Sequence, residues 1–110
     1  MIEETVEKIE TRIQSAEAIN PERKRELVQL LGTLRAEVAA LSQTHGEQAQ
    51  SIAWFTDVST HEATRAEKNP QLLKTSLEGL TGSVAGFEKS HPRLVQIVNA
   101  ISNTLSNLGI

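Results

Sequence analysis

Apolar residues recur at alternating steps of three and four positions along most of this chain. The series run over 2–16, 27–55 and 73–108, and the last has a single polar member, His91. Such spacing places the apolar residues on one stripe of a helix, and it is typical of helices that pack side by side at a shallow angle. Aromatic residues make up only 3% of the chain, which also suits interdigitating helices better than a sheet. We therefore predict an all-α protein.

Two Asn-Pro pairs mark where helices begin. Asn20-Pro21 and Asn69-Pro70 each combine a favoured N-cap residue with a proline at the first helical position, where its missing N–H has no intrahelical partner to lose. They divide the chain into three predicted helices, which cover about 2–18, 21–65 and 70–108.

Two positions could interrupt the longer helices. Gly46 has a low helix propensity, and Pro92 removes a backbone hydrogen bond. The apolar series keeps its register across both positions, so we expect a continuous second helix and a third helix that is only kinked at Pro92.

The short link between the second and third helices makes them antiparallel, so residues whose numbers add up to about 135 should lie side by side. The expected fold is a single domain over 1–110. It consists of a long antiparallel helical hairpin with a shorter N-terminal helix packed on one end, which is a three-helix, coiled-coil-like arrangement.

The first helix is too short to cover the turn-side half of this hairpin. Trp54, Phe55, Val58 and Leu72 lie in that half and would form an exposed apolar patch, which usually marks an interface. We expect these residues to join two copies of the chain in a homodimer. Two alternatives remain open. Trp54 could pack across the hairpin, or the chain could bend at Gly46 and Pro92 and cover the patch as a monomer.

His45 and His91 interrupt the apolar stripe, and the register of the hairpin places them in the same layer. A polar layer of this kind commonly fixes register or oligomeric state. Paired imidazoles could also bind a metal ion, with Glu88 or Glu47 as a third ligand. Glu88 and His91 form a single Glu-x-x-His pair, whereas helical metal sites normally use several, so we predict no metal and no cofactor.

Other motifs for chemistry are missing from the sequence. The chain has no cysteine, which removes disulfides, thiolate nucleophiles and cysteine-ligated zinc. Asp57 and His61 lie four residues apart, a spacing that gives a surface hydrogen bond far more often than a catalytic dyad. No nucleophile motif or phosphate-binding loop is present, so we do not expect an enzyme.

Charge and hydropathy limit the partners. The net charge is −3, and the one basic run, Arg23-Lys24-Arg25, lies between Glu22 and Glu26. A nucleic-acid partner is therefore not expected. No stretch approaches the roughly 20 apolar residues of a membrane span, and the acidic N-terminus is not followed by the apolar segment of a signal peptide. We expect a cytoplasmic protein without a membrane partner.

The C-terminal part of the chain carries a resemblance. The segment Phe-Glu-Lys-Ser-His-Pro-Arg-Leu at 87–94, together with the ending Ser-Asn-Leu-Gly-Ile at 106–110, resembles a family of short bacterial proteins known only as a domain of unknown function. The resemblance implies a bacterial source and a helical fold. The family has no assigned activity, so it implies no catalytic or binding residue.

The sequence thus favours a non-catalytic helical module for protein interaction or oligomerisation, acting as a homodimer or on another protein partner. The alternative is a regulator that responds to a small ligand or a metal ion through His45 and His91.

Overall fold

The computed structural model describes residues 2–17 and 19–108, and over these residues it contains five α-helices and no strand. The all-α prediction is confirmed. The helices are α1 (Ile2–Ser15), α2 (Pro21–Ser42), α3 (Gly46–Thr64), α4 (Pro70–Ser83) and α5 (Pro92–Leu108). None of them is both long enough and apolar enough to cross a membrane.

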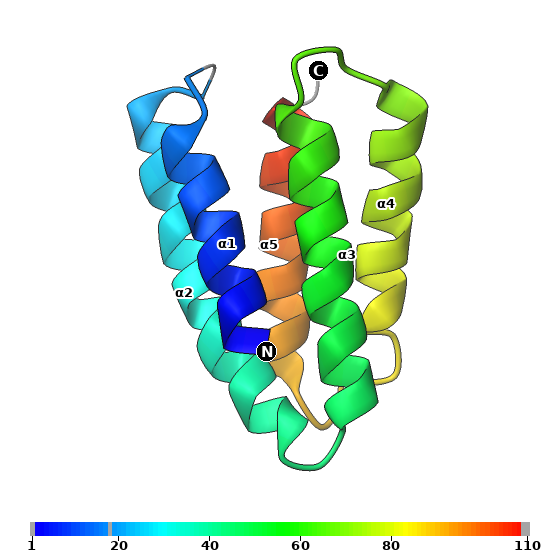
Figure 1. Cartoon of the computed structure of the whole chain (residues 1–110). Coiled ribbons are helices and arrows are strands. Elements are labelled where there is room, and N and C mark those ends of the chain that lie inside the picture. The colour runs from blue at the N-terminus through cyan, green and yellow to red at the C-terminus, as the bar shows by residue number, and fades with distance from the viewer. Residues whose placement is uncertain (1, 18, 109–110) are drawn as a thin grey trace.

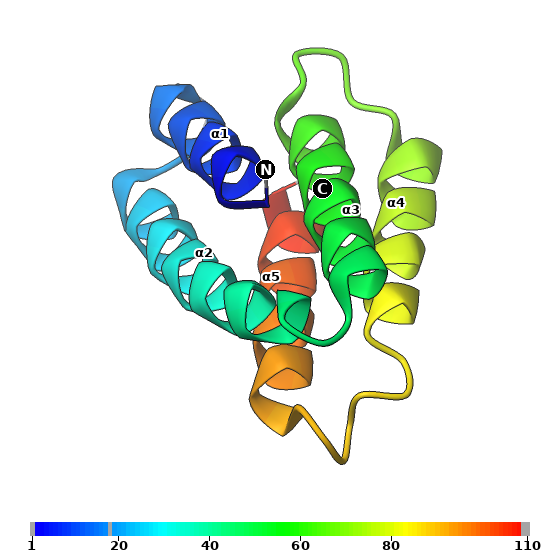
Figure 2. The same ribbon diagram turned by 60° about the horizontal axis from the view of Figure 1, so that its bottom comes forward.

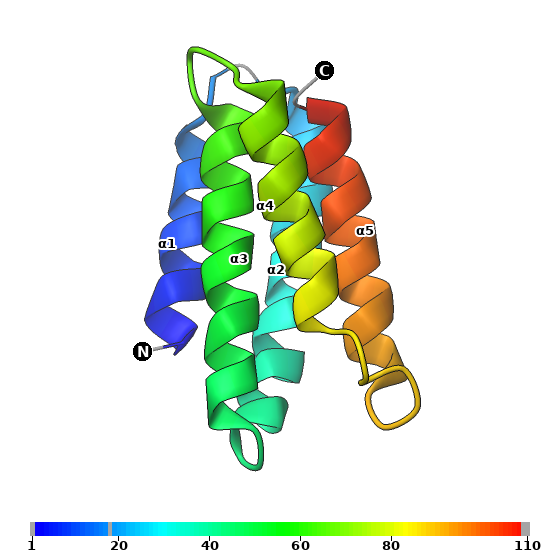
Figure 3. The same ribbon diagram turned by 90° about the vertical axis from the view of Figure 1, so that its right-hand side faces the viewer.

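Each helix runs antiparallel to the one before it, and together they form a bundle of 37 × 24 × 21 Å (Figure 1). α1 packs against α2 and α3, and α5 packs against α2, α3 and α4. α3 also contacts α4, so it lies between α1 on one side and α4 on the other (Figures 1 and 3). The core is aliphatic, and its largest fully buried side chains are Val6, Ile9, Ile13, Leu27, Leu31, Leu34, Leu41, Ile52, Leu80, Leu94, Ile101 and Leu105.

Both Asn-Pro starts are confirmed. The Asn20 side-chain oxygen accepts hydrogen bonds from the backbone N–H groups of Glu22 and Arg23, at 2.9 and 3.1 Å. The Asn69 side-chain oxygen accepts one from the N–H of Leu72 at 3.1 Å. These caps satisfy N–H groups that the first turn leaves without an intrahelical partner.

Each of the two predicted long helices is broken into two, so the predicted three-helix arrangement is wrong. The expected helix over 21–65 stops at Ser42 and a new one starts at Gly46. The expected helix over 70–108 is interrupted over 84–91, where Gly86 adopts a φ of 96° that favours glycine. The first helix also ends at Ser15 and not at 18. Pro92 begins α5 and does not kink a longer helix.

The physical reason for both breaks is coverage of the core. A hairpin of two long rods leaves the apolar faces of its turn-side half in water. Folding α3 and α4 back against α2 and α5 buries those faces, because residues such as Ile52 and Leu80 then join Leu41 and Leu94 in one cluster. The chain bends near Gly46 and Pro92, as in one of the alternatives that the sequence left open, but the bends leave Trp54, Phe55, Val58 and Leu72 exposed.

Candidate functional site

The outward side of α3 is the part of the molecule where large apolar side chains reach solvent. Trp54, Phe55 and Val58 on α3 are 59%, 39% and 48% exposed, and Leu72 in the first turn of α4 is 46% exposed. These four residues are the large hydrophobic side chains exposed in the described part of the chain. We call them the α3 face. Their exposure agrees with the exposed apolar patch expected from the sequence, because the bends in the chain cover these residues only in part.

Phe55 lies against α4 at a glycine. A Cβ atom on Gly79 would collide with the Phe55 ring, so the missing side chain gives the ring its place on the surface of α4. In the hairpin register predicted from the sequence, Phe55 lies opposite Leu80, which is one residue away from its observed neighbour Gly79. The aromatic ring therefore packs α3 against α4, while part of the residue stays exposed to water.

Trp54 lies on the other side of α3, toward α1. It lines a shallow depression with Glu4, Lys8 and Gln50, and more than half of its surface is exposed. The indole therefore does not pack in the core between two helices of a hairpin. This position favours the interpretation in which Trp54 belongs to an outer surface.

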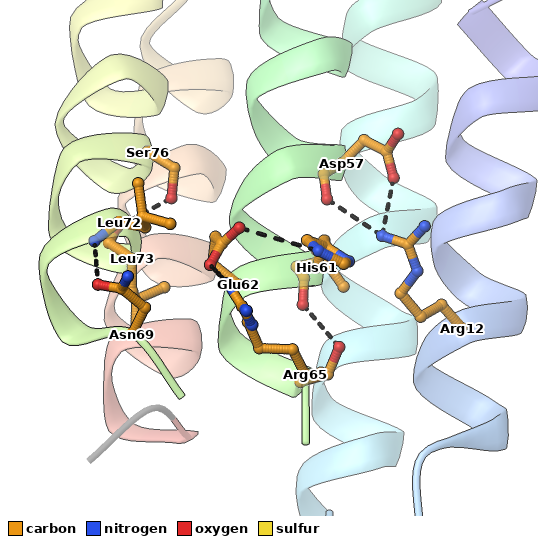
Figure 4. A network of polar contacts seen from close by, with 11 residues as sticks. Arg12, Asp57, His61, Glu62, Arg65, Asn69, Leu72, Leu73 and Ser76 are labelled. Atoms are coloured by element: carbon orange, nitrogen blue, oxygen red, sulfur yellow. Dashed lines mark hydrogen bonds and ion pairs between the residues drawn. The ribbon is translucent and has the colours of Figure 1, made fainter. Parts of the chain in front are cut away.

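Polar contacts lie along α3 and the neighbouring parts of α1 and α4 (Figure 4). On the side of α1, Asp57 accepts a hydrogen bond from the Arg12 guanidinium at 3.1 Å, and the Lys8 ammonium lies 4.0 Å from the same carboxylate. These contacts join α1 to α3, which fixes the position of α3 in the bundle.

At the C-terminal end of α3, the buried Glu62 carboxylate accepts a hydrogen bond from the Arg65 guanidinium at 3.0 Å. The His61 ring lies 3.8 Å from the other oxygen of Glu62. Asp57 and His61 therefore have different partners, Arg12 and Glu62, and they do not form the pair that their spacing allowed.

The structure brings His45 and His91 together, as the register predicted. Their ring centroids are 6.3 Å apart, and the Phe87 ring lies 5.5 Å from each of them, edge to face. They are not on facing helices, however, because His45 directly precedes α3 and His91 directly precedes α5. Figure 2 shows the end of the bundle that carries both turns.

Each imidazole has one nitrogen engaged locally. His45 Nδ1 lies 2.7 Å from the Thr44 hydroxyl, and His91 Nδ1 lies 2.9 Å from the Ser90 hydroxyl. The Glu88 carboxylate accepts a hydrogen bond from the N–H of Gly86 at 2.8 Å. Among residues 2–17 and 19–108, no group of three or more His, Cys, Asp or Glu side chains is placed to hold one metal ion.

A groove between α4 and α5 was not expected from the sequence, because the two helices were predicted to be one rod. Leu73 and Leu77 of α4 line it together with Ser102 and Asn103 of α5. The buried Ser102 hydroxyl has no hydrogen-bond partner among the described residues. Gly86 and Pro92 lie at the connection between the two helices, but the apolar series continues across both, so the sequence carried no signal for the groove itself.

The model of a family described as a domain of unknown function (DUF4404) matches residues 29–110, so the chain belongs to this family. The match begins inside α2, covers α3 to α5 and leaves α1 outside. No curated protein and no solved structure matches the chain.

Proposed function

We propose that this member of the DUF4404 family is a non-catalytic helical interaction module, and that its partner is a second copy of the chain bound at the α3 face. The observation that carries the proposal is the exposure of Trp54, Phe55, Val58 and Leu72 on neighbouring helices of a bundle whose core is otherwise closed. Large apolar residues that gather on one surface usually mark an interaction site.

The energetics support a reversible complex. Burying each of the four half-exposed side chains would contribute roughly 1–2 kcal/mol. The sum over two copies is comparable with the cost of association, which is about 4–15 kcal/mol in lost translational and rotational freedom. Because the core is already buried within one chain, the monomer does not need the partner in order to fold. We therefore expect folded monomers in equilibrium with a dimer, with a dissociation constant in roughly the micromolar range.

The non-catalytic part of the proposal is supported by the partners of the polar residues. Asp57 is held by Arg12, and Glu62 is held by Arg65, so these carboxylates serve contacts between and within helices. These carboxylates therefore have structural partners beside the α3 face and do not line an enclosed pocket among the described residues.

Light scattering on purified variants tests the proposal. Val58→Glu places a charge in the centre of the α3 face, so it should lower the mass of the main species from dimer to monomer. Gln29→Glu, which introduces the same side chain on the exposed surface of α2, should leave the mass unchanged. A wild-type mass equal to one chain, or a dimer that survives Val58→Glu, would reject the proposal.

A regulator that responds to a small ligand or a metal ion is the second candidate, and it rests on the 6.3 Å separation of the His45 and His91 rings. Two imidazoles are fewer ligands than metal sites in proteins normally use. A zinc titration distinguishes the candidates. A rise in the melting temperature at micromolar zinc that disappears in His91→Leu would favour the regulator over the interaction module.

A further inference from the structure

The outward side of α3 carries a second alternating series, which points away from the core. Its members follow at steps of four and three, and they are Glu47, Ser51, Trp54, Val58, His61 and Arg65. All six are exposed or half-buried, whereas Ile52, Ala53 and Ser59 on the inner side are fully buried. α3 therefore packs its inner side on the core, and its outer side has the spacing of a coiled-coil seam.

The charges of this outer series are arranged for pairing with itself. If a second α3 lies antiparallel across it, centred at the level of Thr56, then Trp54 faces Val58 of the second copy. The same register places Glu47 opposite Arg65 of the second copy, at both ends of the seam. A parallel arrangement would instead place Glu47 against Glu47 and Arg65 against Arg65. Because like charges directly opposite each other are unfavourable, the charge pattern selects the antiparallel arrangement.

We propose that two copies of the chain pair through antiparallel α3 helices, with Trp54 and Val58 at the centre of a two-fold interface. This inference rests on the proposed function, and it adds the orientation and the register. Self-complementary contact of one surface with its own copy is the usual geometry of a two-fold dimer.

The surroundings of α3 fit this geometry. α1 and α4 flank α3, and α5 lies on its inner side, so the outer series is not covered by another helix (Figure 1). Phe55 and Leu72 lie on the α4 side of the seam, where α4 of each copy would come to lie beside α4 of the other. Arg65 already donates one hydrogen bond to Glu62 through Nη1. A guanidinium has five N–H donors, so one partner does not prevent a second.

Disulfide cross-linking tests the register, and the absence of cysteine from the chain gives a clean background. In the proposed register Ser51 faces His61 of the second copy. Ser51→Cys combined with His61→Cys should form a covalent dimer under mild oxidation. The two single variants are the matched controls. Two copies of residue 51 would be about 15 Å apart along the helix, too far for a disulfide. The same separation prevents a disulfide within one chain.

Circular dichroism first verifies that the variants fold, and sedimentation under reducing conditions gives their mass. Covalent dimer in the double variant alone supports the antiparallel register. If the variants have the mass of a dimer but the single variants cross-link, the register is wrong. The register is also wrong if the double variant has the mass of a dimer and does not cross-link. Both results would leave self-association itself intact. Monomeric mass in the wild type overturns both the register and the proposed function.

Discussion

Two glycines of this chain stand in different backbone conformations, and the difference decides what a side chain would do there. Gly32 lies inside α2 with helical geometry, and a Cβ atom added to it would meet no other atom within 4 Å. Gly86 lies in the connection between α4 and α5 with a φ of 96°, a conformation that other residues adopt only with strain. Gly32 therefore costs helix stability without a packing role, whereas Gly86 permits a turn.

Gly32→Ala should raise the free energy of unfolding by about 1 kcal/mol, the difference in helix propensity between the two residues. Urea denaturation followed by circular dichroism measures the change. Gly86→Ala is the matched control, and it should lower the free energy of unfolding by about 1 kcal/mol because alanine is strained at positive φ. A loss of stability in Gly32→Ala would contradict the open surroundings of Gly32, because it would mean that the added methyl group collides with another atom.

At the scale of the helices, the sequence predicted the starts at Pro21 and Pro70 and the buried stripes of α1, α2 and α5, but not the breaks before α3 and α5. In α3 only Ile52 of the predicted stripe is fully buried. The Asn-Pro pairs act locally, through side-chain hydrogen bonds and a fixed φ, so they can be read from a few residues. The break before Gly46 has no proline, and its N–H and C=O groups find partners in the adjoining turns. Leu41 before the break and Ile52 after it both face the same core, so their spacing fits one continuous stripe.

The same reasoning explains which parts of the candidate site could be predicted. Both bends occur at one end of the bundle, so the antiparallel neighbours of the hairpin remain neighbours, and His45 still meets His91. Trp54 and Val58 lie off the inner stripe, which indicated their exposure directly. The groove beside Ser102 depends on α4 and α5 being separate helices, and this could not be inferred from a pattern that continues without a break.

Phe87 joins the two bends. Its ring packs edge to face against His45 and against His91, each at 5.5 Å. Phe87→Ala removes these contacts and a half-buried ring, so it should lower the free energy of unfolding by about 1–2 kcal/mol. Gln48→Ala, an exposed change near the same end, should have almost no effect. If thermal denaturation shows equal stability for both variants, the aromatic cluster does not hold the two turns together.

In the molecule as a whole, α1 closes one side of the core although it lies outside the family match. Its residues Val6, Ile9 and Ile13 are fully buried against α2 and α3. Ion pairs also fasten it, and the two shortest are Arg12 with Asp57 at 3.1 Å and Glu10 with Arg35 at 2.6 Å. The matched region over 29–110 therefore does not bury its own apolar faces without this helix.

Removal of residues 1–19 should lower the free energy of unfolding by several kcal/mol, since three side chains worth roughly 1.5–3 kcal/mol each lose their burial. The exposed faces of α2 and α3 should also increase binding of a hydrophobic dye. Ile9→Ala is an intermediate control and should cost about 2–5 kcal/mol. A truncated chain that unfolds as cooperatively as the full one, at the same urea concentration, would show that α1 is not part of the core.

Sedimentation equilibrium of the unmodified chain tests self-association through the α3 face most directly. Each chain has a mass of 12.0 kDa. If the exposed Trp54, Phe55, Val58 and Leu72 are covered by a second copy, the average mass should rise with concentration toward twice that value over roughly the micromolar range. A mass of 12.0 kDa that stays constant up to about a hundred times that concentration would contradict the proposal.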